Sequence, residues 1–520
     1  MKNQTGILSR YLPGRTSELS GNAIIVPIEN EELRNAFATL ETSLPFLTMF
    51  ATEEGETFGI HYVFGLPGEG VPHEKSCIVL RIEGSSFPSL AREFPMTALY
   101  ERLIMTMFGA KAEGHPDPRP LTLHEENWPM NTHPMRKNFK WDTRVPETKS
   151  GEYDFNRVGG EGVYEIPVGP VHAGIIEPGH FRFSVAGEEI IALEARLGWV
   201  HKGVEKLFEN LALEKHLKLA EHISGDSSFS HSLAYCEALE TLTKTALPER
   251  ARYLRLVYAE LERLTMHIFD IGNTGGNGTG FSFLAAHGFR MVEELRRLSA
   301  SLSGNRFLRG LNIPGGVSRD LQEEDVQEVA AFLAHLKEDF SEMMEVADTS
   351  ASLANRLQGT GTLSAQIARE NHAVGIAARC VGISKDVRLE YPYAAYKELK
   401  PEIALESAGD VDARFRIRVK EVYESIRLIE KALRELPGGP ISTPIEPLPH
   451  KGLSVRAVEG WRGEIVYAIV ANEGTISRVA VRDPSFIHWQ LFPHLVTSDM
   501  VPDFPLINKS FNLSYTGNDL

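Results

Sequence analysis

Two short segments of the chain combine small polar and protonatable residues in a pattern that could serve chemistry. Residues 224–228 (Ser-Gly-Asp-Ser-Ser) interrupt two helical patterns rich in Leu and Ala. Residues 482–490, near the C-terminus, include Ser485 and His488. A loop of small residues at a helix junction lets backbone and short side chains approach a ligand closely. We therefore expect the two loops to face each other across one pocket.

The segments that must hold these loops fall into two groups. Residues 23–27, 58–66 and 77–82 read as strands, and residues 31–43 as a helix with one apolar face. From residue 166 onward helical patterns dominate, notably at 205–220, 230–247 and 411–436, with strands at 180–185, 189–193 and within 452–481. The sequence therefore predicts an α+β protein with two domains. A small α+β domain (1–145) and a polar, Gly-rich linker (146–165) precede a mainly helical domain (166–520) with peripheral β-strands.

The composition excludes several classes of protein. The chain has 520 residues, enough for about two to four lobes. Its net charge of -16 argues against a nucleic-acid partner, which would require a basic face. Cys77, Cys236 and Cys380 are too far apart for a CxxC motif or an iron–sulfur framework, and we expect reduced, buried thiols. No stretch approaches the roughly 18–20 apolar residues that cross a bilayer, so attachment to a membrane would require a partner.

Two further patterns allow either a structural or a functional interpretation. His115, His124 and His133 are spaced nine residues apart, which matches no compact ligand pattern, and we expect them to bond to backbone groups. Residues 274–280 (TGGNGTG) look like a dinucleotide loop, but they follow a helical pattern and no βαβ unit is evident. We expect an ordinary loop there and no metal site in the chain.

Several motifs then identify a family resemblance. Glu101-Arg102, residues 114–117 (GHPD) and residues 133–137 (HPMRK) resemble the 30 kDa subunit of respiratory complex I. The chain from Gly169 onward resembles the 49 kDa subunit of complex I and the large subunit of membrane-bound nickel–iron hydrogenases. The matching segments are 169–172 (GPVH), 198–206 (GWVHKGVEK), 260–263 (ELER) and 482–486 (RDPSF). Both units in one chain resemble the group-four hydrogenase large subunits, including that of formate hydrogenlyase.

The departures from this resemblance concern the metal ligands. The hydrogenase subunits hold nickel and iron with four cysteines in two CxxC pairs, because thiolates are the soft, charged ligands these metals need. The corresponding positions here are Ser224, Ser227, Ser485 and His488. We therefore expect no nickel–iron centre. Complex I shows the same loss and binds the quinone headgroup in the vacated cavity, and residues 484–488 (PSFIH) resemble its loop.

The resemblance also implies roles for groups outside the two loops. Glu177 resembles a glutamate that relays protons in the hydrogenases, and His222 aligns with the quinone tyrosine of complex I. The quinone-site histidine matches His180, although this residue follows His172 by eight positions instead of four. We expect Glu177, His180 and His222 to be catalytic, since protonatable groups can deliver protons to a reduced carbonyl. The expected binding residues are His172, Ser224, Asp226, Ser227, Ser485 and His488. Several of these could instead be polar residues that merely line a relic cavity.

The implied function is that of a core peripheral-arm subunit of a complex I-like oxidoreductase, active only within a complex. It would pass electrons from a 4Fe–4S cluster on an iron–sulfur small subunit to quinone, its substrate, with ion translocation left to membrane partners. Expected partners are antiporter-like and anchor membrane subunits and a formate dehydrogenase or similar donor, with no nucleic acid. The expected location is cytoplasmic, on the inner face of the cell membrane. The alternatives are a non-catalytic scaffold between a dehydrogenase and the membrane subunits and, third, a formate hydrogenlyase-type hydrogenase.

Overall fold

The N-terminal part is built on a five-stranded sheet of order β1-β2-β5-β4-β3. The computed structural model describes residues 2–68, 76–140, 142–148, 153–172, 176–497 and 499–520. The strands are β1 (Glu18–Ser20), β2 (Ala23–Pro27), β3 (Phe46–Glu54), β4 (Thr57–Gly65) and β5 (Cys77–Gly84). The helices α2 (Asn30–Glu41) and α3 (Ala98–Phe108) cover one face, and α3 ends at Gly109, whose φ of 80° suits glycine. The sequence predicted β2, β4, β5 and α2 within a few residues.

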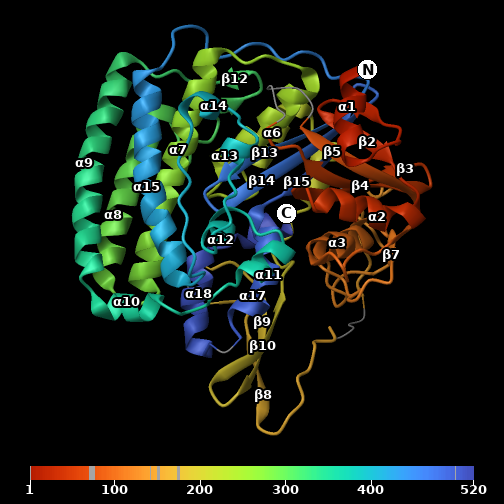
Figure 1. The fold of residues 1–520 in the computed structure, drawn as a ribbon, viewed down its shortest axis with the longest axis horizontal. Coiled ribbons are helices and arrows are strands. Elements are labelled where there is room, and N and C mark those ends of the chain that lie inside the picture. Colours follow the sequence, from red (N-terminus) through yellow and green to blue (C-terminus); the bar gives the residue numbers. More distant parts are fainter. Residues whose placement is uncertain (1, 69–75, 141, 149–152, 173–175, 498) are drawn as a thin grey trace.

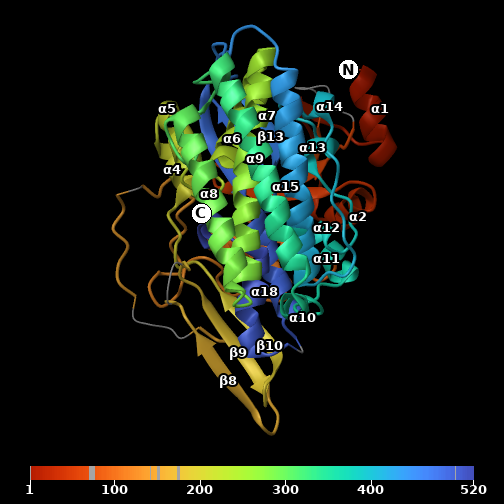
Figure 2. The same cartoon turned by 90° about the vertical axis from the view of Figure 1, so that its left-hand side faces the viewer.

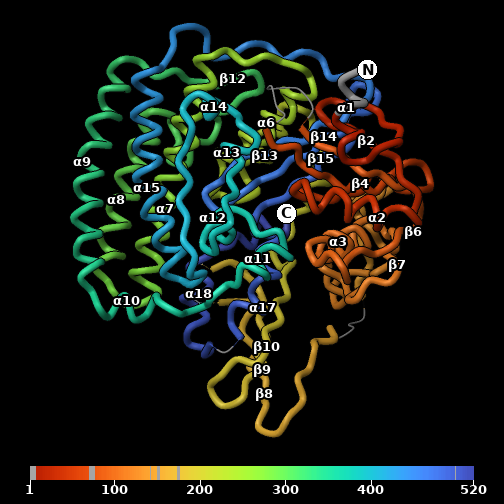
Figure 3. Tube along the Cα trace, viewed as in Figure 1, coloured from red at the N-terminus to blue at the C-terminus, as the bar shows by residue number. Residues whose placement is uncertain are grey.

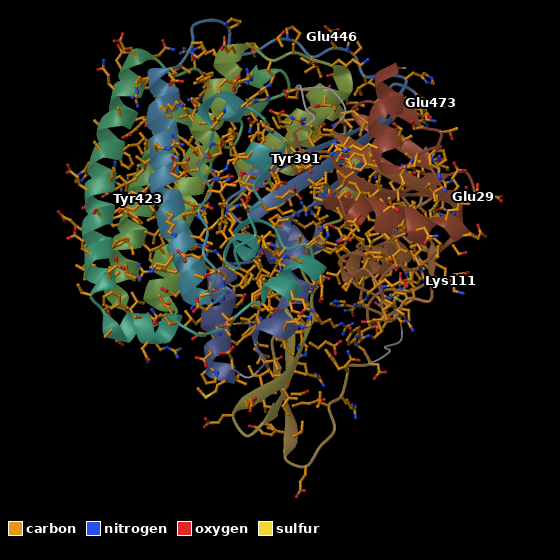
Figure 4. All side chains as sticks on the ribbon, in the orientation of Figure 1. Glu29, Lys111, Tyr391, Tyr423, Glu446 and Glu473 are labelled. Carbon is orange, nitrogen blue, oxygen red and sulfur yellow. The ribbon has the colours of Figure 1, made fainter. Side chains whose placement is uncertain are left out.

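The other face of this sheet packs on the rest of the chain. Val63, Cys77 and Val79 belong to the same buried cluster as the helices of the second domain. Gly65 lies so close to Tyr391 that a Cβ atom there would meet the phenol oxygen at 2.0 Å, and Figure 4 labels Tyr391 in the middle of the molecule. The small domain is therefore joined to the large one through a shared core.

The large domain is organised around long helices that lie side by side (Figures 1 and 2). They are α6 (Ser228–Thr243), α7 (Glu249–Ile271), α8 (Ser282–Ser303), α9 (Glu323–Asp348) and α15 (Val411–Arg434). The residues of α6 are buried all round, as befits a helix at the centre of a core. On the outer side, Tyr423 of α15 packs against Phe340 of α9 with ring centroids 5.4 Å apart.

The motif at residues 260–263 contributes to a buried network of ion pairs. Glu260 pairs with Arg388 at 3.1 Å and Glu421 pairs with Arg379 at 2.6 Å, and the neutral imidazole of His267 donates a hydrogen bond to Glu421 at 2.7 Å. Buried charges are tolerated only when they are paired in this way. Arg263 lies 3.3 Å from Glu421, and the Ser425 hydroxyl donates to Glu260 at 2.6 Å, so these motif residues hold α7 against α15.

A second sheet, β13 (Lys451–Gly460), β14 (Gly463–Asn472) and β15 (Thr475–Arg482), is an antiparallel meander packed on α6. The chain continues from β15 into α16 (Pro484–His488), the turn η3 (Trp489–Leu491) and, further on, α19 (Tyr515–Asp519). A third sheet, β8 (Val163–Val168), β9 (His180–Ala186) and β10 (Glu189–Arg196), projects from the body at the bottom of Figure 3. Gly187, at φ 64°, lies in the hairpin turn that joins the two predicted strands β9 and β10.

The structure corrects several local expectations. The single helix predicted at 205–220 is two helices, α4 (Val204–Asn210) and α5 (Leu213–Ala220), since residues 211 and 212 leave the helix. Strand β3 was not foreseen, and residues 274–280 include a helical turn of the π type that continues α7. Strand β8 already begins at Val163, inside the segment expected to be linker. Among the described residues, no helix combines the length and apolar character needed to span a bilayer.

Candidate functional site

The two loops singled out in the sequence meet through a third segment. Ser224 lies between α5 and α6, and Ser485 lies in α16. The hydroxyl oxygens of Ser224 and Ser514 are 2.8 Å apart, and the backbone N–H of Ser514 donates to Ser485 Oγ at 2.9 Å. Ser514 caps the last helix, α19, with its side chain. The predicted approach of the loops is thus present, with a C-terminal serine between them.

Asp226 is held by an arginine on the turn between β13 and β14. Arg462 donates to both carboxylate oxygens, at 2.9 and 2.5 Å, and Ser224 Oγ donates to Oδ1 at 2.7 Å. Burial raises the pKa of Asp226, but Arg462 outweighs this effect and leaves the pKa below its ordinary value. Asp226 is therefore a fixed anion at the edge of the site. Ser227 Oγ lies 3.3 Å from the Arg462 guanidinium and joins the same group.

A cavity of about 400 Å³ opens beside this group. Glu177 and Asp226 both line it, and the backbone N–H of Thr516 donates to Glu177 Oε2 at 3.1 Å. The Lys202 ammonium bonds to the Thr516 hydroxyl. Burial raises the pKa of Glu177 above its ordinary value. The further lining residues include Arg296, Lys509, Asn512 and Tyr515.

His488 is not one of the residues that line this cavity. It is buried, and its Nε2 accepts the backbone N–H of Val374 at 3.3 Å. Burial lowers the pKa of His488 to about 3, so its imidazole is neutral. Asp483 accepts from His231 at 3.1 Å and from the Ser485 backbone N–H at 2.7 Å, which fixes the start of α16.

The other candidate histidines lie outside the cavity. His172 Nε2 donates to the carbonyl of Gly179 at 2.8 Å, within the turn before β9. His180 Nδ1 is 3.3 Å from the carbonyl of Gly169, and burial lowers its pKa. His222 is exposed and bonds to Lys218 O at 2.6 Å, with Arg309 Nη1 3.3 Å from its Nε2. The structure thus brings Glu177, Ser224, Asp226 and Ser227 together, with Ser485 and His488 behind them.

The loop histidines of the small domain bond to backbone groups, as expected. His115 reaches the carbonyl of Ala98, and His124 reaches that of Leu197. His133 reaches the carbonyl of Thr106. Within the described ranges, His, Cys, Asp and Glu side chains do not gather in threes in a way that could hold a metal ion.

The donor set also does not fit a nickel–iron centre. Ser224 and Ser227 offer neutral hydroxyls, and both are committed to Asp226 or Ser514. Ser485 accepts a backbone N–H, and His488 Nε2 is occupied by Val374. Nickel and iron centres of this type need thiolates, and the three cysteines of the chain are buried elsewhere.

Several site residues escaped the sequence analysis. Arg462, Ser514 and Thr516 carry no motif, and only folding brings them to residues 224–227. Lys202 lies in the motif at 198–206, and that motif could have pointed to it. The sequence analysis did not predict that its ammonium bonds to Thr516 and to the carbonyls of residues 222 and 223.

Comparison with known proteins agrees with this arrangement. The family described as "Respiratory-chain NADH dehydrogenase, 49 Kd subunit" matches residues 278–519, and the corresponding "30 Kd subunit" family matches residues 26–145. Formate hydrogenlyase subunit 5 of Escherichia coli (strain K12) is 31% identical over 473 residues, covering 89% of this chain and 82% of the relative.

Two further relatives each cover about two thirds of the chain. NADH-quinone oxidoreductase subunit 4 of Thermus thermophilus is 30% identical over 378 residues, which cover 67% of this chain and 92% of the relative. A chain in the structure of the membrane-bound sulfane sulfur reductase, an archaeal respiratory membrane complex, is 26% identical. It has a TM-score of 0.65 and covers 69% of this chain and 99% of its own. The chain therefore belongs to the family of complex I-type subunits and joins the 30 kDa and 49 kDa units in one polypeptide.

Proposed function

We propose that the chain is the acceptor-binding subunit of a membrane-associated, complex I-like oxidoreductase. In this proposal an iron–sulfur cluster on a neighbouring subunit supplies electrons, and a quinone-type acceptor takes them in the cavity beside Glu177 and Asp226. The observation that supports it most is the replacement of the thiolate positions by a hydrogen-bonded group of hydroxyls, Ser224, Ser514 and Ser485, next to an open cavity. Such a cavity suits an organic acceptor better than a metal.

Reduction of a quinone to a hydroquinone consumes two electrons and two protons. The electrons come from the neighbouring cluster, and the protein must supply the protons at the carbonyl oxygens. Glu177 is the cavity residue suited to this task, because its raised pKa leaves part of the carboxyl groups protonated nearer to neutral pH. The Thr516 backbone N–H donates to the carboxylate and holds it in place, and Lys202 bonds to the Thr516 hydroxyl behind it. In this proposal Glu177 takes its protons from solvent that enters the cavity.

The remaining groups of the cavity position the acceptor. The paired charges of Asp226 and Arg462 form a fixed dipole at its edge, and the Ser224 hydroxyl lies between them and Ser514. We propose that His180 and His222 have secondary roles, because neither lines the cavity. His172 fixes the turn that carries Glu177 toward the site.

The relatives support a proposal for the assembly. We propose an iron–sulfur small subunit, antiporter-like and anchor membrane subunits and a dehydrogenase, such as a formate dehydrogenase, as partners on the inner face of the cell membrane. This rests on relatives named as subunits of NADH-quinone oxidoreductase and formate hydrogenlyase, and on the likeness to a chain of a respiratory membrane complex.

A scaffold without chemistry is the second candidate. It is favoured by the fact that most polar groups of the site satisfy one another, as in the two-point pairing of Asp226 with Arg462 and the bond from Val374 to His488. Such a chain would link a dehydrogenase to membrane subunits and transmit conformational change only.

The experiment that tests the proposal is isolation of the tagged chain from gently solubilised membranes, followed by mass spectrometry and by assay of quinone reduction. Recovery of a cluster-bearing small subunit with membrane subunits and quinone turnover supports the proposal. Recovery of the same subunits without quinone turnover supports the scaffold. Recovery of the chain alone in the soluble fraction contradicts both.

A further inference from the structure

Three arginines gather round one phenylalanine ring beside the acceptor cavity. The guanidinium carbons of Arg296, Arg306 and Arg309 lie 5.5, 4.8 and 5.4 Å from the centroid of the Phe307 ring. Arg296 belongs to α8, and the other two arginines lie in the segment that follows this helix. The face of an aromatic ring attracts cations, so Phe307 helps to hold these like charges together. We call the three arginines the arginine cluster.

Arg296 is the member of the arginine cluster that lines the acceptor cavity. Burial lowers the pKa of Arg296, and the positive charge of Arg306 lowers it further. The carboxylates of Asp226 and Glu293 act in the opposite direction, but each is already paired with another arginine. Among the described residues Arg296 has no ion pair of its own, although it is partly buried. It therefore presents an unmatched positive charge to the cavity.

The other two members of the cluster extend this charge along the loop of the site. Arg306 is exposed, and it forms no ion pair with any residue that the structure describes. Arg309 donates to the Ser228 hydroxyl at 3.1 Å and lies 3.3 Å from His222 Nε2, so neither of its side-chain contacts is a carboxylate. It also packs on the loop itself, since a Cβ atom on Gly225 would meet its guanidinium at 3.3 Å.

A lysine from another helix adds to the positive charge of the cavity. Lys509, near the end of α18 (Phe504–Phe511), lines the cavity and makes no ion pair within the described part of the chain. The carboxylates on the same wall do not offset these cations. Asp226 is neutralised by Arg462, and the raised pKa of Glu177 reduces its negative charge. The cavity is therefore positive within a chain whose net charge is -16.

The same cavity has apolar surface that suits a flat ring. Met266, Phe269 and Tyr515 contribute to its lining. An occupant that matches both features combines an aromatic ring with a negatively charged group. A guanidinium binds the oxygens of such a group through charge-assisted hydrogen bonds, which are stronger than those to a neutral carbonyl. A neutral quinone would use the apolar surface and leave the cations unmatched.

We propose that the acceptor of this chain is an anionic quinone, whose acidic substituent binds Arg296 after Arg306 and Arg309 have attracted it to the cavity. The inference rests on the proposed function and names the chemical class of its acceptor. A cleft lined by one sign of charge raises the local concentration of an oppositely charged substrate and the rate of its association. The chemistry is unchanged: two electrons and two protons convert the quinone carbonyls to hydroxyls, and the acidic substituent takes no part.

Two probes that differ by one charge test this inference. They are naphthoquinone sulfonate, which is an anion, and the corresponding naphthoquinone without the sulfonate. The purified complex is reduced with dithionite and freed from it, and the second-order rate constant for reduction of each probe is measured by stopped-flow absorbance. The ratio of the two rate constants is then compared between variants, which cancels the intrinsic reactivity of the probes. A change that merely perturbs the fold affects both probes and leaves the ratio as it was.

The variants remove one positive charge each. Arg296→Gln acts inside the cavity, and Arg306→Gln acts at the exposed end of the cluster. Arg290→Gln is the matched control, because Arg290 lies on the same helix but is paired with Glu294 and Asp339 at 2.8 Å each. Mass spectrometry of every purified complex verifies that its subunits are retained.

We expect Arg296→Gln to lower the ratio of anionic to neutral probe about tenfold, the low end for loss of a hydrogen bond between charged groups. Arg306→Gln should lower it about threefold through weaker steering, and Arg290→Gln should leave it unchanged. In the wild type the ratio should fall as salt is added, because screening weakens only the attraction of the anion.

The inference is overturned if Arg296→Gln has the same ratio as the wild type and the control, while both probes are still reduced. It is also overturned if Arg296→Gln or Arg306→Gln loses a subunit that the control retains, since the cluster would then serve to dock a protein partner. If the wild-type complex reduces neither probe, the proposed function fails and the inference fails with it. The two failures are therefore distinguishable.

Discussion

The hydroxyl oxygens of Ser224 and Ser514 lie 2.8 Å apart, and Ser514 in turn bonds to Ser485 through its backbone N–H. By the resemblance described in the sequence analysis, we expect Ser224 and Ser485 to correspond to metal-binding cysteines of the hydrogenase large subunits. Here the same positions are linked by neutral hydrogen bonds, and the nearest charge, Asp226, is already neutralised by Arg462. In this interpretation the chain has exchanged a soft-metal site for a polar, hydrogen-bonded wall beside a cavity.

This exchange predicts the metal content of the protein. The chain, purified alone or in its complex, should contain no stoichiometric nickel, because hydroxyls and one buried neutral imidazole are poor ligands for it. Elemental analysis by mass spectrometry is the measurement, and a chelator should not change thermal stability. One nickel per chain together with hydrogen uptake would revive the hydrogenase interpretation.

The pairing of Asp226 with Arg462 should contribute to stability. Replacing Arg462 by Ala leaves the carboxylate without its partner, and we expect the free energy of unfolding to fall by about 2 kcal/mol. This is less than the roughly 3–5 kcal/mol of a fully buried pair, since the Asp226 side chain is 31% exposed. The shift of the urea midpoint measures it. The double variant Asp226→Asn/Arg462→Ala should recover part of the loss, whereas equal losses in the single and double variants would show that the pair does not couple.

Three buried imidazoles should make stability depend on pH. Burial lowers the pKa of His61 to about 3, of His267 to about 4 and of His488 to about 3, from an ordinary value of 6.5. At pH values between the folded-state pKa of each histidine and 6.5, the unfolded chain binds protons that the folded chain does not. Their contribution to stability is therefore complete above pH 6.5 and is lost as the pH falls toward 4, by about 1.4 kcal/mol per pH unit for each histidine. Denaturant unfolding at a series of pH values measures how the free energy of unfolding depends on pH. His488→Gln should reduce this slope by about 1.4 kcal/mol per pH unit. A slope that is unchanged in His488→Gln would contradict the burial argument.

The positions of His180 and His222 predict a small effect of their removal. Neither side chain lines the cavity that contains Glu177. The double variant His180→Ala/His222→Ala should therefore retain quinone turnover within about twofold, since proton delivery by a well-placed group is worth roughly 10²-fold or more. Steady-state assay of the assembled complex is the measurement. A loss of that larger size would return the proton-donor role to one of these histidines.

Much of the architecture was predictable from local patterns. The apolar stripe of α9 and the strands around Gly187 follow directly from residue spacing. The break between α4 and α5 was not predictable, because residues 211 and 212 (Leu-Ala) have no turn character and only the surrounding packing bends the chain there.

The site was predictable only in part. The spacing of Ser224 and Ser227, and of Ser485 and His488, pointed to the two loops through the family resemblance. The partner that joins them, Ser514, lies 290 positions away from Ser224 in sequence. No local pattern encodes such a contact. His222 shows that a family resemblance can also point to a residue outside the cavity. It aligns with a functional residue of the family but is exposed and bonds to Arg309.

The central claim is that a quinone-type acceptor takes its electrons and protons in the cavity lined by Glu177. The most direct test is the rate at which the purified complex, reduced at its iron–sulfur centres by dithionite, reduces a soluble quinone after correction for the direct chemical reaction. Glu177→Gln should lower this rate by about 10²-fold with the complex intact. The matched variant Glu188→Gln, at an exposed turn of the projecting sheet, should leave it unchanged. Wild-type turnover by Glu177→Gln in a fully assembled complex would contradict the account.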